Sequence, residues 1–303
     1  MKGRFQLSVL DNGPWLWVRE GAASWLDSIG VHRRASQYDD SQLAACCLFI
    51  GYPRSGHSVV GSVLDAHPDA LVAHRLDAVG YIERGYSPTM LAHMIVCNSR
   101  RFALNGRGLT GYSYHIPDSW QGRYRTLRVI GDQEGRLTAV RLAAHPASLD
   151  AFEQRFGVPV KLLHVIRNPY DNITTWAIKR FAKLETTIAA YFALCHAVAT
   201  VIEHRQGQGI MHIRHEEFLA RPQAIIPAIC HFVGLEPQPD FVSSCVASLY
   251  QSPRISRHQR SWPPHLIARV AEEAAAFPFL QGYGWDDQAL SMGTTDAEDT
   301  AQP

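Results

Sequence analysis

Apolar residues gather in four short runs along the chain, and each run is followed by a loop and then by a stretch with helical periodicity. The runs lie in "CCLFIGY", "LRVIGD", "VKLLHVI" and "IMHIR", which begin at residues 46, 127, 160 and 210. A continuous apolar run is typical of a parallel strand, because such a strand is covered on both faces. Strands that alternate with helices predict a three-layer α/β fold, with a parallel central sheet flanked by helices.

The strength of this pattern divides the chain into three parts. Residues 1–44 show no clear period and form an N-terminal extension, residues 45–287 carry the α/β pattern, and residues 288–303 have the composition of a disordered tail. The longest apolar stretch, "IAAYFALCHAVATVI", has 15 residues and contains His196. It is too short to span a bilayer and predicts a buried helix.

Composition limits the choice of partners and cellular compartment. The 303 residues carry a net charge of +1, so no overall field favours nucleic acid or acidic lipid, and any anion site must be local. The six cysteines show no CxxC spacing and lie mostly in apolar runs, which indicates small buried side chains and neither a zinc site nor a disulfide framework. The first residues contain no uninterrupted apolar region, so a cytoplasmic protein is expected.

The segment "GYPRSGHS" at residues 51–58 joins the first apolar run to a helical pattern. Its spacing is that of the phosphate-binding loop G-x-x-x-x-G-K-[ST], with His57 in place of the lysine. Gly51 and Gly56 permit close backbone approach, and a helix N-terminus offers free N–H groups to an anion. Arg54 lies inside the loop, and its forked guanidinium suits a tetrahedral oxyanion. The order of strand, loop and helix therefore predicts an anion site.

A second arginine directly follows the third apolar run. In "LLHVIR" this cation is Arg167, at a position where a nucleoside triphosphatase would carry a magnesium-binding aspartate. Arg167 therefore indicates a second anion contact without a metal. The run "LRVIGD" ends in Asp132, so a P-loop kinase or triphosphatase with magnesium stays open as an alternative.

The two motifs together resemble a known family. "GYPRSGHSVVGSVLDAHPD" is similar to the 5′-phosphosulfate loop of the sulfotransferases that use 3′-phosphoadenosine-5′-phosphosulfate (PAPS), above all in the protein-tyrosine and bacterial small-molecule branches. "LLHVIRNPYDNITTW" resembles their 3′-phosphate motif, with Thr175 eight residues after Arg167. "IRHEEFLARPQAIIPAICHFVGLE", "SPRISRHQRSW" and "FPFLQGYGW" resemble later blocks of the family, so the resemblance covers about residues 46–285.

The resemblance implies a P-loop-containing, sulfotransferase-like fold and an enzyme of bacterial secondary metabolism. The enzyme would move a sulfuryl group in line, without a metal, from PAPS to a hydroxyl or amine of a small-molecule acceptor, leaving 3′,5′-adenosine bisphosphate (PAP). Neither nucleic acid nor a membrane is implied as a partner, and the oligomeric state stays open. The residues implied in nucleotide binding are Arg54, Ser55, Gly56, His57 and Ser58 at the 5′ end, and Arg167, Thr175, Arg254 and Arg257 at the 3′ end.

Two positions depart from the family pattern. Arg75 stands where the protein-tyrosine branch has a glutamate that acts as base, and Gln133–Glu134 replaces a lysine pair of the bacterial branch. These departures leave open a sulfotransferase-like protein that binds nucleotide without transfer. The candidates for the base are His57, His74, Asp77 and Asp132.

Aromatic residues of the long loop before the second apolar run are candidates for an acceptor pocket. Tyr112, Tyr114 and Trp120 offer flat apolar faces with polar tips. Packing of the loop on its own body is the alternative for all three. Whether the sulfate ester is the final product or a leaving group for a later step also stays open.

Overall fold

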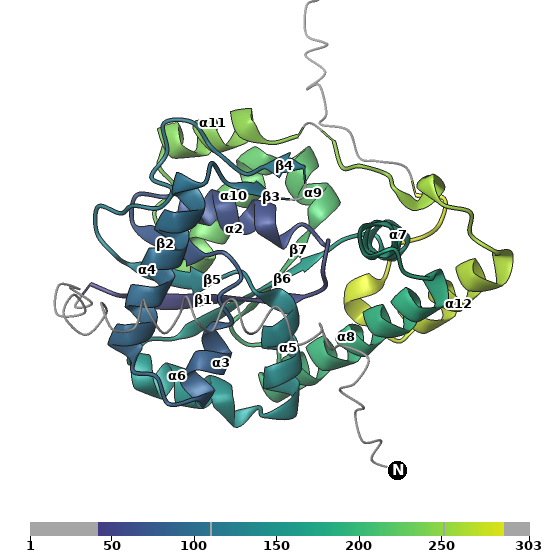
Figure 1. Cartoon of the computed structure of the whole chain (residues 1–303), viewed down its shortest axis with the longest axis horizontal. Helices are drawn as coiled ribbons and strands as arrows, with labels where there is room; N and C mark the ends of the chain where they lie inside the picture. The colour runs from purple at the N-terminus through teal and green to yellow at the C-terminus, as the bar shows by residue number, and fades with distance from the viewer. Residues whose placement is uncertain (1–41, 110, 251, 288–303) are drawn as a thin grey trace, which may run out of the picture.

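The computed structural model describes residues 42–109, 111–250 and 252–287, so the predictions for residues 1–41 and for the tail from 288 lie outside the described residues. A parallel five-stranded sheet in the order β2-β5-β1-β6-β7 forms the centre, and helices cover both of its faces (Figure 1). The prediction of a three-layer α/β fold is confirmed. The strands are β1 (Ala45–Gly51), β2 (Ala70–Ala73), β5 (Val129–Asp132), β6 (Val160–Ile166) and β7 (Ile210–Arg214).

The helices pack on the two faces of the sheet as two separate apolar cores. The larger core is covered by α3 (Ala78–Glu83), α4 (Pro88–Leu104), α5 (Gly135–Ala144), α6 (Ala147–Phe156), α7 (Pro169–Arg180), α8 (Leu184–His204) and α12 (Pro264–Ala275). The smaller core is covered by α2 (His57–Asp65), α9 (His215–Ala220), α10 (Pro222–Val233) and α11 (Pro239–Ser248). A two-stranded hairpin, β3 (Gly108–Leu109) and β4 (Tyr112–Ser113), and two short 3₁₀ helices, η3 (Arg257–Gln259) and η4 (Pro278–Leu280), complete the described elements.

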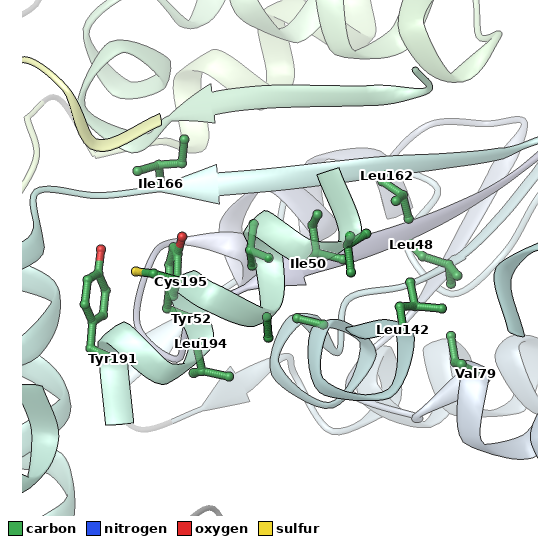
Figure 2. Close-up of a cluster of buried hydrophobic side chains, with 14 of the residues drawn as sticks. Leu48, Ile50, Tyr52, Val79, Leu142, Leu162, Ile166, Tyr191, Leu194 and Cys195 are labelled. Carbon is green, nitrogen blue, oxygen red and sulfur yellow. The ribbon is translucent and has the colours of Figure 1, made fainter. Parts of the chain in front are cut away.

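Strand β1 is apolar along its whole length because it contributes to both cores. Its side chains alternate between the larger core, with Cys46, Leu48 and Ile50, and the smaller core, with Ala45, Cys47 and Phe49. Figure 2 shows Leu48 and Ile50 of β1 with Leu162 of β6 above Leu142 of α5. Burying one such large aliphatic side chain stabilises the fold by roughly 1.5–3 kcal/mol.

Strand β2 is an element that the apolar pattern alone does not predict. It has only four residues, "ALVA", and lies at the edge of the sheet. The buried carboxylate of Asp65 accepts a hydrogen bond from the Val72 N–H at 2.6 Å and so fixes the strand to α2. Ala73 lies beside Asp132 in the register of β2 with β5. The turn that follows β2 is therefore delivered to the carboxyl edge of the sheet.

Helix α8 contains the longest apolar stretch of the chain. Among the described residues it is the one helix long and apolar enough to cross a membrane by length and composition, and 56% of that apolar window is buried inside the fold. A core helix of a soluble protein passes the same test. Cys195 of this helix lies in the larger core with Tyr52 and Tyr191 (Figure 2). The prediction of a helix over this stretch is confirmed.

Candidate functional site

The loop after β1 wraps the N-terminus of α2 in a strained backbone conformation. Arg54 has a φ of 72° and Gly56 a φ of 103°, both in the left-handed region. Such a conformation is uncommon for a residue with a side chain and is concentrated at functional sites. Ser55 is fully buried, whereas Arg54 and Ser58 keep partial exposure. The loop therefore presents its backbone and the Arg54 side chain at the carboxyl edge of the sheet.

Gly56 also meets the imidazole of His215, the first residue of α9. A Cβ at position 56 would stand 2.3 Å from His215 Nδ1 and 2.8 Å from its Cε1. His215 Nδ1 is buried without a hydrogen-bond partner, and burial lowers the pKa of His215 to about 3, so the ring is neutral. The sequence motif contains no signal for His215, which reaches the loop only because β7 ends near it.

We expect Gly56→Ala to destabilise the fold more than a matched change at Gly85. Gly85 has a φ of 87° and open space where a Cβ would stand, so Gly85→Ala costs only the strain of the positive φ, about 1 kcal/mol. Gly56→Ala adds an overlap with His215, about 1–3 kcal/mol more. Urea unfolding of the two variants measures the difference. Equal losses, or no recovery in the double variant Gly56→Ala with His215→Ala, would contradict the role given to the His215 contact.

Arg167, the arginine of the second anion motif, directly follows β6. The residue is 7% exposed, and its guanidinium donates to Thr175 Oγ1 at 3.3 Å and to Ser256 Oγ at 3.2 Å. The two hydroxyls are 2.7 Å apart. Thr175 comes from the second turn of α7, which begins two residues after Arg167. The structure thus brings Arg167 and Thr175 together and adds Ser256, which the motif did not identify.

The basic segment around Ser256 closes over Arg167 through its backbone and a hydroxyl. The carbonyl of Arg254 accepts a hydrogen bond from Arg167, while the Arg254 side chain is exposed. Arg257 is 2% exposed and pairs with Asp171 of α7 at 3.2 Å, and its backbone N–H donates to the same carboxylate. This placement favours an anchoring role for Arg257, whereas the exposed Arg254 side chain donates to the Gln259 amide oxygen, turned to face it, at 3.1 and 3.2 Å.

The two halves of the site touch. Arg167 Nη1 lies 3.4 Å from the carbonyl oxygen of Arg54, so the cation of the second motif contacts the backbone of the first. Asn172 of α7 joins them again, because its amide, turned to face its partners correctly, donates to Pro53 O at 2.8 Å and accepts from Ser55 N at 3.3 Å. Residues at least 113 positions apart in sequence thus build one continuous anion-facing surface.

His57 begins α2 and is held in its neutral form. Burial lowers its pKa to about 4, with Arg75 and Arg54 acting in the same direction and Glu134 opposing. Its Nδ1 lies 3.3 Å from the Ser55 hydroxyl. A neutral imidazole next to the phosphate-type loop has a lone pair that can accept a proton.

His74 is the neighbour of His57 at the end of β2. It stacks on Phe102 with ring centroids 4.0 Å apart, and its Nδ1 pairs with the Gln133 side-chain amide. Burial lowers the pKa of His74 to about 3. The Gln133 side chain occupies Nδ1 and leaves Nε2 of His74 for any other partner. This geometry favours His57 over His74 as the base.

Asp132 lies at the end of β5 with no exposed surface. Its carboxylate accepts the backbone N–H groups of Leu76 at 2.9 Å and Ala78 at 2.8 Å. Burial raises the pKa of Asp132 to about 7, although both backbone bonds act to lower it. These contacts favour a role in holding the turn after β2. Asp77 is likewise occupied, by a two-point ion pair with Arg141 at 2.8 Å.

Arg75 and Glu134, which both depart from the sulfotransferase sequence pattern, form an ion pair. Arg75 Nε donates to Glu134 Oε2 at 3.2 Å, and Glu134 Oε1 accepts the Leu137 N–H at the start of α5. Burial acts to raise the pKa of Glu134, but Arg75 and this N–H lower it on balance, so Glu134 is ionised. The sequence shows two separate charge changes, and the structure joins them as one ion pair.

The three aromatic residues proposed for an acceptor pocket, Tyr112, Tyr114 and Trp120, lie at different distances from the anion site. The side chain of Tyr114 hydrogen-bonds Ser58 and lies near Arg54, and Tyr112 makes an edge-on contact with Tyr250 at 6.2 Å between ring centroids. Tyr112 also lies near Arg54. The backbone N–H of Trp120 instead donates to Ala66 O at the C-terminal end of α2, and Arg123 lies over the Trp120 ring. Tyr112 and Tyr114 therefore border the anion site, and Trp120 does not.

No protein-family model and no curated protein matches the sequence. Solved structures similar to the chain include the sulfotransferase domain of the Synechococcus PCC 7002 olefin synthase, at 14% identity and a TM-score of 0.42 over 76% of this chain and 88% of that chain. Sulfotransferase STF9 from Mycobacterium avium is 11% identical, with a TM-score of 0.45 over 85% of this chain and 82% of the other.

A third similar structure is mouse sulfotransferase SULT7A1, solved in complex with PAP, at 15% identity and a TM-score of 0.37 over 74% of this chain and 70% of that chain. Identities and TM-scores of this size carry no argument about activity, which must come from the residues of the site. The three structures named above are sulfotransferases, the family that the two anion motifs resemble.

Proposed function

We propose that this protein is a sulfotransferase that moves the sulfuryl group of PAPS to a hydroxyl or amine of a small-molecule acceptor. The observation that carries the proposal is the contact between Arg167 and the backbone of the Arg54 loop. Two cationic motifs in contact match a nucleotide with anions at both its 5′ and its 3′ position. A nucleotide without a 3′-phosphate would leave the buried Arg167 without a function in binding.

The residues present suit such a nucleotide. Arg167 Nε is buried and has no hydrogen-bond partner among the described residues, which leaves an N–H to be satisfied. Thr175 and Ser256 place two hydroxyls beside it. The loop from Ser55 to Ser58 enters the N-terminus of α2, where backbone N–H groups favour an anion. We assign the 3′-phosphate to the first group of residues and the 5′-phosphosulfate to the loop and Arg54.

PAPS would supply an activated sulfuryl group, and catalysis would then rest on positioning and electrostatic stabilisation. In this chain Arg54 and the loop N–H groups stabilise the negative charge on the sulfuryl oxygens. His57, neutral and next to Ser55, accepts the proton of the acceptor hydroxyl. Tyr114, hydrogen-bonded to Ser58, keeps that hydroxyl oriented toward the loop. Removing one donor of this kind in other enzymes slows catalysis about 10²–10³-fold.

We expect PAP and PAPS to raise the unfolding temperature of the purified protein, with or without chelator, and AMP to do so far less. A ligand at 100 times its Kd stabilises the folded state by about 2.7 kcal/mol. Thermal unfolding with each nucleotide, and with ATP plus magnesium, makes the comparison. A shift with ATP and magnesium alone would overturn the proposal in favour of a P-loop kinase. Binding of PAP without any sulfation across an acceptor panel would favour the nucleotide-binding protein without transfer.

A further inference from the structure

The turn after β2 is held by an unusual number of polar contacts. Asp132 accepts the N–H groups of Leu76 and Ala78, and Asn98 Oδ1 accepts the His74 N–H at 2.7 Å. Within this turn Arg75 has a φ of 56° and Asp77 a φ of 69°. Two non-glycine residues at positive φ in one turn store strain, which the buried Asp132 carboxylate offsets. The turn is therefore rigid and presents the residue at its tip.

The residue presented is Arg75. Its side chain is 49% exposed, although the Glu134 carboxylate with which it pairs is only 6% exposed. The contact with Glu134 uses the Nε group. The two Nη groups, the open end of the fork, have no partner among the described residues. A guanidinium held at Nε with its outer N–H groups directed to solvent is arranged to bind a second oxyanion at two points.

The position of Arg75 lies on the acceptor side of the proposed transfer. Its charge acts on His57, His74 and Arg54, so it stands near the candidate base and the 5′ loop. Arg167 and its partners lie on the other side, because β6 and β2 are on opposite sides of β1. Arg75 is therefore close enough to meet an acceptor bound beside His57 and too far along the sheet to serve the 3′-phosphate.

Resting on the proposed function, we infer that Arg75 binds an oxyanion of the acceptor, so the acceptor carries a carboxylate or a phosphate-type group next to the hydroxyl or amine that is sulfated. Glu134 is the positioning residue: it orients the guanidinium through Nε and leaves the outer fork for the substrate. A neutral acceptor would leave this fork in contact with water alone. Arg75, at the tip of the turn, thus favours an anionic acceptor over a neutral one.

The probes for this inference are phenyl phosphate, benzoate and the neutral benzyl alcohol, titrated by calorimetry into the protein with and without saturating PAP. We expect phenyl phosphate, benzoate or both to bind and benzyl alcohol to bind at least tenfold more weakly. Arg75→Gln should weaken the anionic probes at least tenfold, and Arg75→Lys should weaken them less. The preferred anion, carboxylate or phosphate, identifies the acceptor group.

The matched control is Arg125→Gln. Arg125 is also about half exposed, at 52%, and pairs with the carboxylate of Asp69. It precedes β5 and so lies at the amino end of the strands, whereas Arg75 follows β2 at their carboxyl end. This variant should bind every probe as the native protein does. The inference is overturned if no anionic probe binds, if benzyl alcohol binds equally well, or if Arg75→Gln weakens PAP and leaves the probes unchanged. Native protein that fails to bind PAP contradicts the proposed function instead, and the probes without PAP still test Arg75.

Discussion

Arg167→Gln is expected to weaken PAP binding by a factor of at least 100 while leaving AMP binding nearly unchanged. Arg167 is 7% exposed, and its guanidinium donates to the hydroxyls of Thr175 and Ser256, so a 3′-phosphate would meet a positive charge that water screens poorly. Charge-assisted hydrogen bonds contribute about 1.5–3 kcal/mol each, and two of them correspond to the expected loss. Calorimetric titration of both nucleotides measures the ratio.

Two further variants define what Arg167 contributes. Arg167→Lys keeps the charge but not the fork, so its PAP affinity should fall between those of the native protein and the glutamine variant. Arg205→Gln is the control, because Arg205 makes a similar two-point contact with Glu153 remote from the loop. That variant should bind PAP normally. A folded Arg167→Gln protein with native PAP affinity would show that the nucleotide lies elsewhere.

The parts of the site that the sequence predicts are those whose spacing is local. Arg167 and Thr175 are eight residues apart on a strand end and the helix that follows, so their meeting depends only on helix geometry. The Arg54 loop likewise lies between one strand and one helix. In both cases the apolar pattern supplies the elements, and a short motif supplies the chemistry.

The contacts that could not be predicted cross the sheet. Ser256 reaches Thr175 across 81 residues, and His215 reaches Gly56 only because β7 lies beside β6. Arg75 and Glu134 were identified singly as departures, but their pairing depends on the register that sets Ala73 beside Asp132. Strand β2, which creates that register, has four residues and no pattern long enough to recognise. Sheet order and register therefore carry the information that single motifs lack.

The buried histidines are expected to make the protein sensitive to mild acid. Burial lowers the pKa of His57 to about 4 and those of His74 and His215 to about 3, and it lowers the pKa of His164 well below its usual value. Unfolding returns each imidazole to water, where it takes up a proton below about pH 6.5. The unfolded state then binds more protons than the folded state, so stability falls as the pH falls from about 6.5 toward the folded values.

Asp132 acts in the opposite direction, because its pKa is raised to about 7 and the folded state takes up its proton first. Burial also raises the pKa values of Asp65, Asp77 and Glu216, which act with Asp132, and lowers those of His67 and His212, which act with the other histidines. Each net proton taken up on unfolding lowers the free energy of unfolding by about 1.4 kcal/mol per pH unit, and because the histidines outnumber the opposing carboxyls we expect a fall of roughly 1–3 kcal/mol per unit. Against a typical total of about 5–15 kcal/mol, a fall of this size is readily measured between about pH 6.5 and 5.

Urea unfolding at several pH values between 7.5 and 5 measures this slope directly, and the slope is independent of any stability that a variant loses at all pH values. His74→Gln should lower the slope by about one proton, since its imidazole is buried and neutral in the folded state. His265→Gln is the control, because His265 is exposed and its imidazole stays in water in both states. An equal slope in His74→Gln and the native protein would mean that the His74 imidazole is already protonated in the folded protein, which would contradict its burial as a neutral ring.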